Sequence, residues 1–216
     1  MMIKNDFLSM KQINQRRVIQ FINKNKMLKS AFKYYLEYNT GCNNPYHNVN
    51  HTMAMMDILI DMDPEDDNLH TMLLAAIFHD MNHSAGKMDD IHNVDNSIDA
   101  YYSFCTKYPF YFDKNIEKII RTTQFPYKEG DKLNYMQRKV READNLVCFY
   151  DDFLTQVLLG LKEEMHVTDL NIMIQNELKF FENSWKNLEL AYSKRCVNKY
   201  KDEIKEYLKE IKNVID

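Results

Sequence analysis

The chain has 216 residues, of which 45% are hydrophobic and 28% are charged, and its formal net charge is −4. This apolar fraction excludes wholesale disorder, and the length suits one domain, which we expect over residues 1–216. The negative charge argues against a protein that wraps duplex nucleic acid, because such a protein needs a basic face. With no secretory signal and no apolar run near the roughly 20 residues of a membrane span, we expect no membrane partner. The expected location is the cytoplasm, or the host cytoplasm if the chain is viral.

Glycine and proline are both scarce, with four of each. Sheets need tight turns, and tight turns favour these residues, so the composition predicts an all-α chain. The cysteines also number four and are far apart in the sequence. Neither a disulfide framework nor a zinc ribbon is therefore expected.

Apolar residues at helical spacing predict the elements of the first half of the chain. Helices are expected over Phe7–Asn23, Lys26–Tyr38 and Val49–Asp61. A fourth is expected from Asp63 to His79, because an Asp-Pro pair followed by acidic residues suits a helix start.

The second half is predicted to be helical as well. A polar loop leads into a helix over Asn93–Tyr108, and further helices are expected over Asp113–Thr123 and Lys132–Gly160. The last of these passes two acidic residues, Asp151–Asp152, which we interpret as surface residues. Two or three amphipathic helices complete the chain over residues 166–214.

The histidines are concentrated in one part of the sequence, with six of the seven between His47 and His92. Two pairs are four residues apart: His47 with His51, and His79 with His83. Residues at this spacing on a helix, or at its end, share one face, so each pair can reach one centre or two neighbouring centres. We interpret the others as ordinary surface or core residues: His70, His92 and His166.

Polar residues also stand at three positions that the pattern places inside the protein. His51 begins an apolar helical stripe, His79 and Asp80 close an apolar helix, and Asp144 lies within a third helix. Unpaired buried charge is costly, so these positions need a reason. Imidazole and carboxylate ligands suit Zn, Mn, Fe, Ni or Co, and a carboxylate can bridge to a second ion. The pattern therefore indicates a divalent metal site.

These segments resemble a known family. In order, they match the H…HD…D signature of the HD-domain metal-dependent phosphohydrolases. Tyr46–His51 also looks like the Y-H-N-x-x-H segment of the class I cyclic nucleotide phosphodiesterases, His79–His83 like their H-D-x-x-H segment, and Ala143–Asp144 like their downstream A-D. The matching core motifs fall within residues 45–146, under half of the chain.

The resemblance implies an all-α HD-domain helical bundle with a central metal site. Asp80 would bridge from a first ion, which could be Zn, Mn, Fe, Ni or Co, to a second, Mg or Mn. His47 would be the general acid that protonates the leaving oxygen, and His83 would lie near the water of the second ion. The ligands of the first ion would be His51, His79, Asp80 and Asp144.

The chain departs from the phosphodiesterase pattern after His83. Those enzymes continue P-G-x-x-N, whereas here Met88 stands where the asparagine would fall, and Asn93 is a candidate for that role. Three further residues are candidate substrate contacts, although a solvated loop or a helix end is the simpler interpretation of each: Lys87, Arg121 and Gln124.

The preferred interpretation is a divalent-metal-dependent phosphodiesterase acting on a cyclic nucleotide or a short cyclic oligonucleotide. In this mechanism a metal-bound hydroxide attacks phosphorus and an imidazole protonates the departing oxygen. One alternative is a nucleotidase or a nucleoside di- or triphosphate hydrolase, and another is a non-catalytic nucleotide-binding regulator. The expected partner is a small nucleotide, and the sequence leaves the oligomeric state open.

Overall fold

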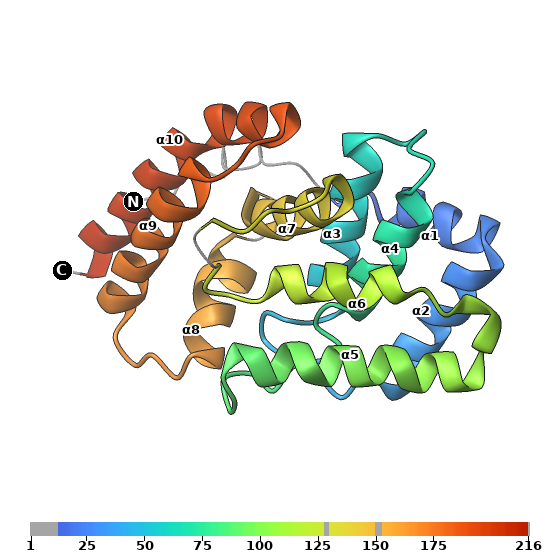
Figure 1. Cartoon of the computed structure of the whole chain (residues 1–216). Coiled ribbons are helices and arrows are strands. Elements are labelled where there is room, and N and C mark those ends of the chain that lie inside the picture. Colours follow the sequence, from blue (N-terminus) through green and yellow to red (C-terminus); the bar gives the residue numbers. More distant parts are fainter. Residues whose placement is uncertain (1–12, 128–129, 150–152, 216) are drawn as a thin grey trace.

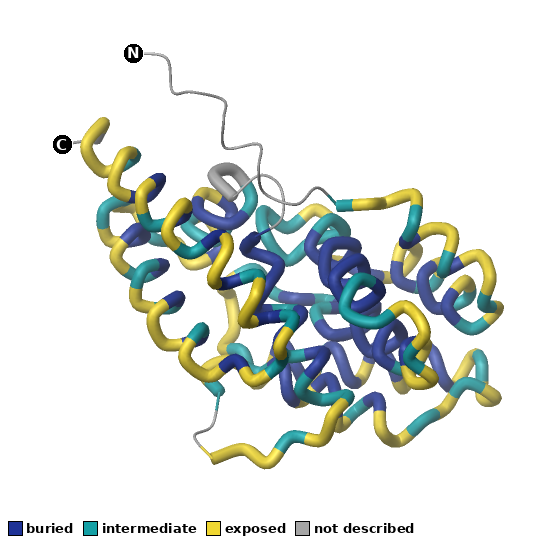
Figure 2. Tube along the Cα trace, turned by 90° about the horizontal axis from the view of Figure 1, so that it is seen from above, coloured by how far each residue is buried: buried dark blue, intermediate teal, exposed yellow. Residues whose placement is uncertain are grey.

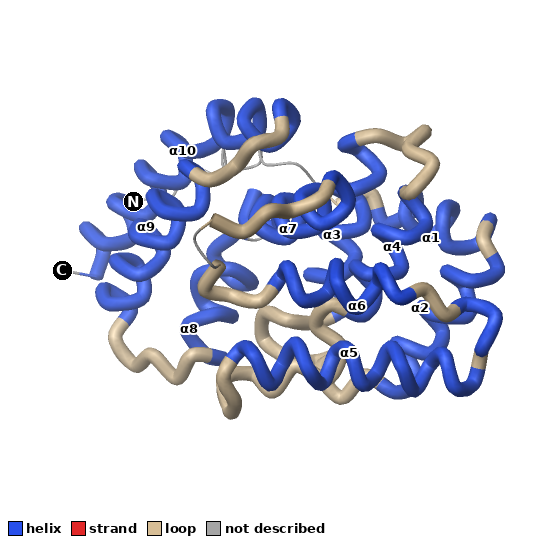
Figure 3. Tube along the Cα trace, viewed as in Figure 1, coloured by secondary structure: helices blue, strands red, loops and turns tan. Residues whose placement is uncertain are grey.

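A computed structural model describes residues 13–127, 130–149 and 153–215. All regular structure in these ranges is helical, which confirms the prediction of an all-α chain (Figure 3). A π-helical segment, Phe153–Gly160, runs directly into α8, and short 3-10 turns occupy Pro109–Tyr111, Arg121–Thr123 and Val147–Phe149. The α-helices are α1 (Gln15–Lys24), α2 (Lys26–Tyr38), α3 (Val49–Met62), α4 (Leu69–Phe78), α5 (Asp90–Lys107), α6 (Lys114–Ile120), α7 (Tyr135–Leu146), α8 (Leu161–Glu164), α9 (Leu170–Lys186) and α10 (Ala191–Ile215).

Two helices, α3 and α4, form the centre of the molecule and pack against each other. Residues 51–60 of α3 and residues 72–78 of α4 are all buried. A helix that is buried on every side needs its polar residues paired. Asp57 of α3 meets this need, since its carboxylate accepts a hydrogen bond from Arg17 Nε at 2.7 Å. Because both helices are buried, His51 at the start of α3 and His79 just after the end of α4 lie in the interior.

The other helices surround this central pair. α1 packs on α3 and α2 on α4, while α6 and α7 cover another side and α5 lies against α6 (Figure 1). Figure 2 shows the buried residues concentrated in the middle and the exposed ones along the outer helices. The central helices are thus held from several directions, which fixes the segments that carry the histidines.

The last two helices, α9 and α10, lie side by side and join the rest of the molecule through α7 and the π-helical segment (Figure 1). Along α10 the buried residues recur every three or four positions, as the predicted amphipathic pattern requires: Val197, Tyr200, Ile204, Tyr207 and Leu208. The connection between α9 and α10 is held by Glu142 of α7, whose carboxylate accepts the backbone N–H groups of Glu189 and Leu190.

Two predicted elements differ from the structure. The fourth helix starts at Leu69 and not at Asp63, because Asp66 instead pairs with Lys139 of α7 at 2.7 Å and holds this segment in turns. The seventh predicted helix ends as an α-helix at Leu146 and continues as a 3-10 turn.

Parts of two further predictions, residues 7–12 of the first helix and the acidic pair Asp151–Asp152, lie outside the described residues. Elsewhere the helix bounds differ from the predicted ones by a few residues, and Lys26–Tyr38 agrees at both ends. None of the helices in the described ranges combines the length and the apolar character needed to cross a membrane.

Candidate functional site

The segment before α3 is positioned by a helix cap. Asn48 is the N-cap of α3, and its side-chain oxygen accepts the backbone N–H groups of Asn50 at 2.8 Å and His51 at 3.3 Å. Its amide group donates to the carbonyl of Asn44 at 2.8 Å. Asparagine is a favoured N-cap because its oxygen satisfies N–H groups that the helix leaves free. The cap therefore fixes His47 just outside the helix and His51 one turn inside it.

Asparagine side chains also tie this segment to the one after α4. The Asn39 oxygen accepts the backbone N–H of Asn82 at 2.8 Å, and the Asn82 oxygen accepts that of Thr40 at 3.0 Å. The Asn44 amide donates to the carbonyl of His83 at 2.9 Å. These bonds connect residues about forty positions apart and bring the two histidine pairs into one region.

The end of α4 is held by α5. The hydroxyl of Ser97 donates to the carbonyl of His79 at 2.7 Å, a group that the end of the helix leaves without a helical partner. The His79 ring is fixed as well, because its Nδ1 lies 2.8 Å from the carbonyl oxygen of Ala76. A carbonyl can only accept, so Nδ1 carries the proton and Nε2 of the neutral ring presents a lone pair.

Four side chains converge on one point, and we call them the metal group: His51, His79, Asp80 and Asp144. The Nε2 atoms of His51 and His79 are 3.1 Å apart. His51 Nε2 lies 3.2 Å from a carboxylate oxygen of Asp80 and 3.2 Å from one of Asp144. For His79 Nε2 the corresponding distances are 2.9 Å and 3.7 Å. The structure thus brings together all four residues that the sequence predicts as ligands.

The donor set of the metal group fits a divalent ion. Atoms that share an ion at about 2.1 Å lie roughly 3.0–3.4 Å from one another, close to the spacings observed here. Both imidazoles are buried, and the group attracts positive charge. Burial by itself lowers the pKa of His51, but the carboxylates of Asp144 and Asp80 outweigh it and raise this pKa to about 10. His51 Nδ1 is also buried without a hydrogen-bond partner among the described residues.

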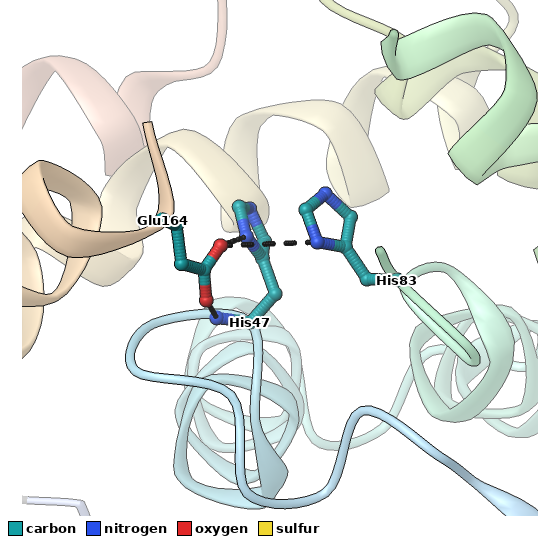
Figure 4. A group of neighbouring side chains, drawn as sticks. All are labelled: His47, His83 and Glu164. Atoms are coloured by element: carbon teal, nitrogen blue, oxygen red, sulfur yellow. Dashed lines mark hydrogen bonds and ion pairs between the residues drawn. The ribbon is translucent and has the colours of Figure 1, made fainter. Parts of the chain in front are cut away.

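A second group lies beside the first and contains His47, His83 and Glu164; we call it the histidine–glutamate group (Figure 4). One oxygen of Glu164 lies 2.6 Å from His47 Nδ1, and the other accepts the backbone N–H groups of Tyr46 at 2.7 Å and His47 at 2.9 Å. Burial alone raises the pKa of Glu164, but these donors lower it below its ordinary value. The carboxylate therefore stays ionised and orients the His47 ring.

The ring of His83 lies against the ring of His47, with the centroids 3.8 Å apart (Figure 4). N–H groups face both of its nitrogens, because the backbone N–H of Ala85 is 3.2 Å from Nδ1 and the Asn93 amide nitrogen is 3.0 Å from Nε2. Burial, together with the neighbouring His47, lowers the pKa of His83 to about 4.

His51, His79 and Asp144 of the metal group, and likewise the three residues of the histidine–glutamate group, could hold a metal ion by the proximity of their ligand atoms. The geometry separates the two groups, however. Glu164 accepts three hydrogen bonds from the protein, and the two rings of the histidine–glutamate group lie at an interplanar angle of 31°. In the metal group, nitrogen and carboxylate oxygen atoms instead face one another, so the lone pairs there suit an added cation better.

Both groups open into a cavity of about 590 Å³, which we call the central cavity. His47, His51, Asp80, His83 and Asp144 line one part of it. α9 contributes another part of the wall, which includes the ring of Phe180, and the ring of Phe125 lines the cavity as well. A cavity of this size accommodates a ligand as large as a mononucleotide.

The four candidate substrate contacts differ in whether they reach the central cavity. Asn93 is buried, lines the central cavity and holds His83. Lys87 is exposed in the loop between two cavity-lining residues. Arg121 is exposed and pairs with Asp95 and Glu117. The structure does not place Lys87, Arg121 or Gln124 among the residues that line the cavity. The three histidines that have no second histidine four residues away are exposed: His70, His92 and His166.

Sequence reasoning missed Glu164 and the asparagines that tie the two loops together. Glu164 is 117 residues from His47, in a segment with no motif of its own, so no local signal marks it. Asn48 did carry a signal, since an asparagine before an apolar helical stripe is typical of an N-cap. Comparisons with protein-family models, curated proteins and solved structures return no match to this chain.

Proposed function

We propose that this protein is a divalent-metal-dependent phosphohydrolase of the HD-domain type, acting as a phosphodiesterase on a cyclic nucleotide or a short cyclic oligonucleotide. One observation carries the proposal. Two imidazoles and two carboxylates from three separate segments meet, with each imidazole nitrogen within 3.7 Å of both carboxylates, beside an imidazole that a buried glutamate orients.

The metal group would hold the ions through His51, His79, Asp80 and Asp144, with Asp80 as the bridging carboxylate. When bound, such ions neutralise the charge of a phosphate and lower the pKa of a coordinated water. Their identity is proposed from the ligands: a transition metal at the mixed nitrogen and oxygen position, and Mg or Mn at the more oxygen-rich one.

His47 is suited to act as the general acid. Its Nδ1–H is engaged by Glu164, so Nε2 is the nitrogen that would take up a second proton and, from the imidazolium form, donate it to the leaving oxygen. The ring centroid of His47 lies 5.4 Å from that of His51, which places the donor beside the metal group. Because the pKa of His83 is lowered to about 4, that ring is neutral near pH 7 and is better suited to support His47 than to supply the proton.

The proposal is tested by metal analysis and product analysis on the full chain purified without chelator. Elemental mass spectrometry measures the bound metal, and a panel of cyclic and linear nucleotides is incubated with added Mn²⁺ or Mg²⁺. We expect bound transition metal and a linear monophosphate released from a cyclic substrate.

The other outcomes distinguish the alternatives. Bound metal with release of inorganic phosphate would replace the phosphodiesterase by the nucleotidase or nucleoside di- or triphosphate hydrolase. Tight nucleotide binding without turnover would indicate the regulator. Absence of metal even after reconstitution would refute the metal group itself.

A further inference from the structure

The wall of the central cavity that α9 forms has no role in the proposed chemistry, yet it carries a buried acid. Glu177 lies on α9, lines the cavity and is 4% exposed. Its carboxyl group has neither a hydrogen bond nor an ion pair with any residue that the structure describes. Buried carboxyl groups are normally paired, because removing one from water without a partner is costly.

The surroundings of Glu177 do not supply a positive charge. The groups close enough to influence it include Tyr46 and Cys148, and the negative charge of Glu177 contributes to raising the pKa of both. Lys179 also lines the cavity, but it is exposed and forms no ion pair in the described part of the chain. Burial accordingly raises the pKa of Glu177 itself to about 8, so the ligand-free acid is mostly protonated at neutral pH. Hydrogen-bond donors that enter the cavity would favour its ionised form.

Asn145 also lines the cavity. It donates through its amide group to the hydroxyl of Tyr127 and to the carbonyl of Arg141, both at 2.8 Å. Since a carbonyl cannot donate, the bond to Arg141 fixes the orientation of the Asn145 amide. Its oxygen is fully buried without a donor among the described residues, so it is not in reach of a ligand in the cavity. Of these two groups, Glu177 is therefore the one that a ligand could pair with.

Aromatic rings also line this part of the cavity. Phe125 and Phe180 meet edge to face with centroids 5.6 Å apart, and Phe125 meets Tyr127 in the same way at 5.5 Å. Flat apolar surfaces combined with a few fixed polar groups are typical of a site for a planar ligand. The hydrogen-bond donors that Glu177 lacks have to come from the ligand itself.

We infer that this wall binds the base of the nucleotide and, with Glu177 ionised, selects guanine, whose adjacent N1–H and amino groups match a carboxylate. The inference rests on the proposed function, which supplies the phosphate end of the ligand. Adenine and cytosine each present one amino group beside a ring acceptor, and uracil presents one N–H between two carbonyls. These bases would leave an acceptor of the wall unpaired or bring two acceptors together, and such mismatches are rejected strongly.

The test is equilibrium binding of mononucleotides to the full chain in the presence of Mn²⁺, measured by calorimetry at pH 8.5, where Glu177 is mostly ionised. GMP and IMP form the decisive pair, because IMP lacks only the amino group. We expect GMP to bind about 10–100-fold more tightly than IMP, AMP or CMP, the range of a charge-assisted hydrogen bond. Glu177→Gln should remove this preference. Glu182→Gln, a change of the same kind at an exposed residue of α9, should retain it.

The wild-type result decides the inference even if Glu177→Gln fails to fold. Equal binding of the mononucleotides, or no binding, would overturn it, and so would a guanine preference that survives Glu177→Gln. A separate assay with bis(4-nitrophenyl) phosphate, which carries no base, reports on the proposed function. Turnover of that substrate without a base preference would refute the guanine site alone, whereas absence of both metal and turnover would refute the proposed function.

Discussion

The two histidine groups lie side by side but differ in how their polar atoms are satisfied. In the histidine–glutamate group, Glu164 accepts two backbone N–H groups and orients His47, and Asn93 and Ala85 face the nitrogens of His83. In the metal group, nitrogen and carboxylate oxygen atoms face one another at 2.9–3.7 Å, and His51 Nδ1 has no partner among the described residues.

This difference shows what each group needs. In the histidine–glutamate group, the protein itself supplies the partners of Glu164 and of His47 Nδ1, which holds the His47 ring in one orientation. The metal group could be completed by a bound cation, because its two carboxylates lie beside two imidazoles in a largely buried position. Proximity of ligand atoms alone does not separate them, and the hydrogen-bond partners do.

The largest effect is expected from removing a carboxylate of the metal group. Asp80→Ala should abolish metal binding and turnover together, because Asp80 contacts both imidazoles and would bridge the ions. Elemental mass spectrometry and a turnover assay measure the two losses. Asp99→Ala, at an exposed position on α5, is the control and should change neither. Full metal content in Asp80→Ala would contradict the assignment.

A change in the histidine–glutamate group should separate metal binding from rate. His47→Ala should retain the metal and lower the rate about 10²–10⁴-fold, the usual loss for a missing general acid. Full activity on a substrate with a poor leaving group would show that the role is assigned wrongly.

Glu164 is expected to act through His47, which a double variant can check. Glu164→Gln should lower the rate by less than His47→Ala does. Combining the two changes should be no worse than His47→Ala alone, because the orienting group has nothing left to orient. Rate losses that multiply would instead indicate an independent role for Glu164.

A smaller effect is expected where the loop after α4 touches Glu164. Gly86 has φ +76°, and a Cβ there would lie 1.8 Å from the carbonyl oxygen of Glu164. Gly86→Ala should therefore displace Glu164 and lower the rate about 10-fold or more, since small displacements near a reacting centre have large effects.

Gly130 is the matched control for this change. It also has a positive φ, +81°, but nothing lies within 4 Å of an added Cβ. Gly130→Ala should lower the free energy of unfolding by about 1–2 kcal/mol from backbone strain alone and leave the rate unchanged. Equal effects of the two substitutions, in urea unfolding and in turnover, would show that the contact with Glu164 is unimportant.

Glu177 is expected to affect the pH dependence of stability without changing the proposed chemistry. The pKa of Glu177 rises from 4.5 to about 8 on folding, so the folded chain binds more protons than the unfolded chain between these values. The stability linked to Glu177 is thus fully present below pH 4.5 and is lost as pH rises through 8, by up to a few kcal/mol. Melting temperatures of the ligand-free protein from pH 5 to 8.5 should fall less steeply in Glu177→Gln. Parallel curves for wild type and variant would contradict the burial of this acid.

Much of the helical framework could be predicted from the sequence, because helix formation depends on local spacing. Lys26–Tyr38 agrees at both ends for this reason. The start of α4 was predicted wrongly, since the Asp-Pro pair suggested a helix where Asp66 instead pairs with Lys139, 73 residues away. Such a partner leaves no trace in the local pattern.

The candidate site shows the same division. From the sequence by itself, the four residues of the metal group were singled out as ligands by their resemblance to the H…HD…D signature. The local pattern alone marks Asp144 weakly, because charged residues surround it on its helix. Only the tertiary structure decided that Glu164 orients His47 and that Glu177 and Asn145 line the cavity without donors. A lone acid or amide is common in any sequence, and its meaning depends on which groups folding places beside it.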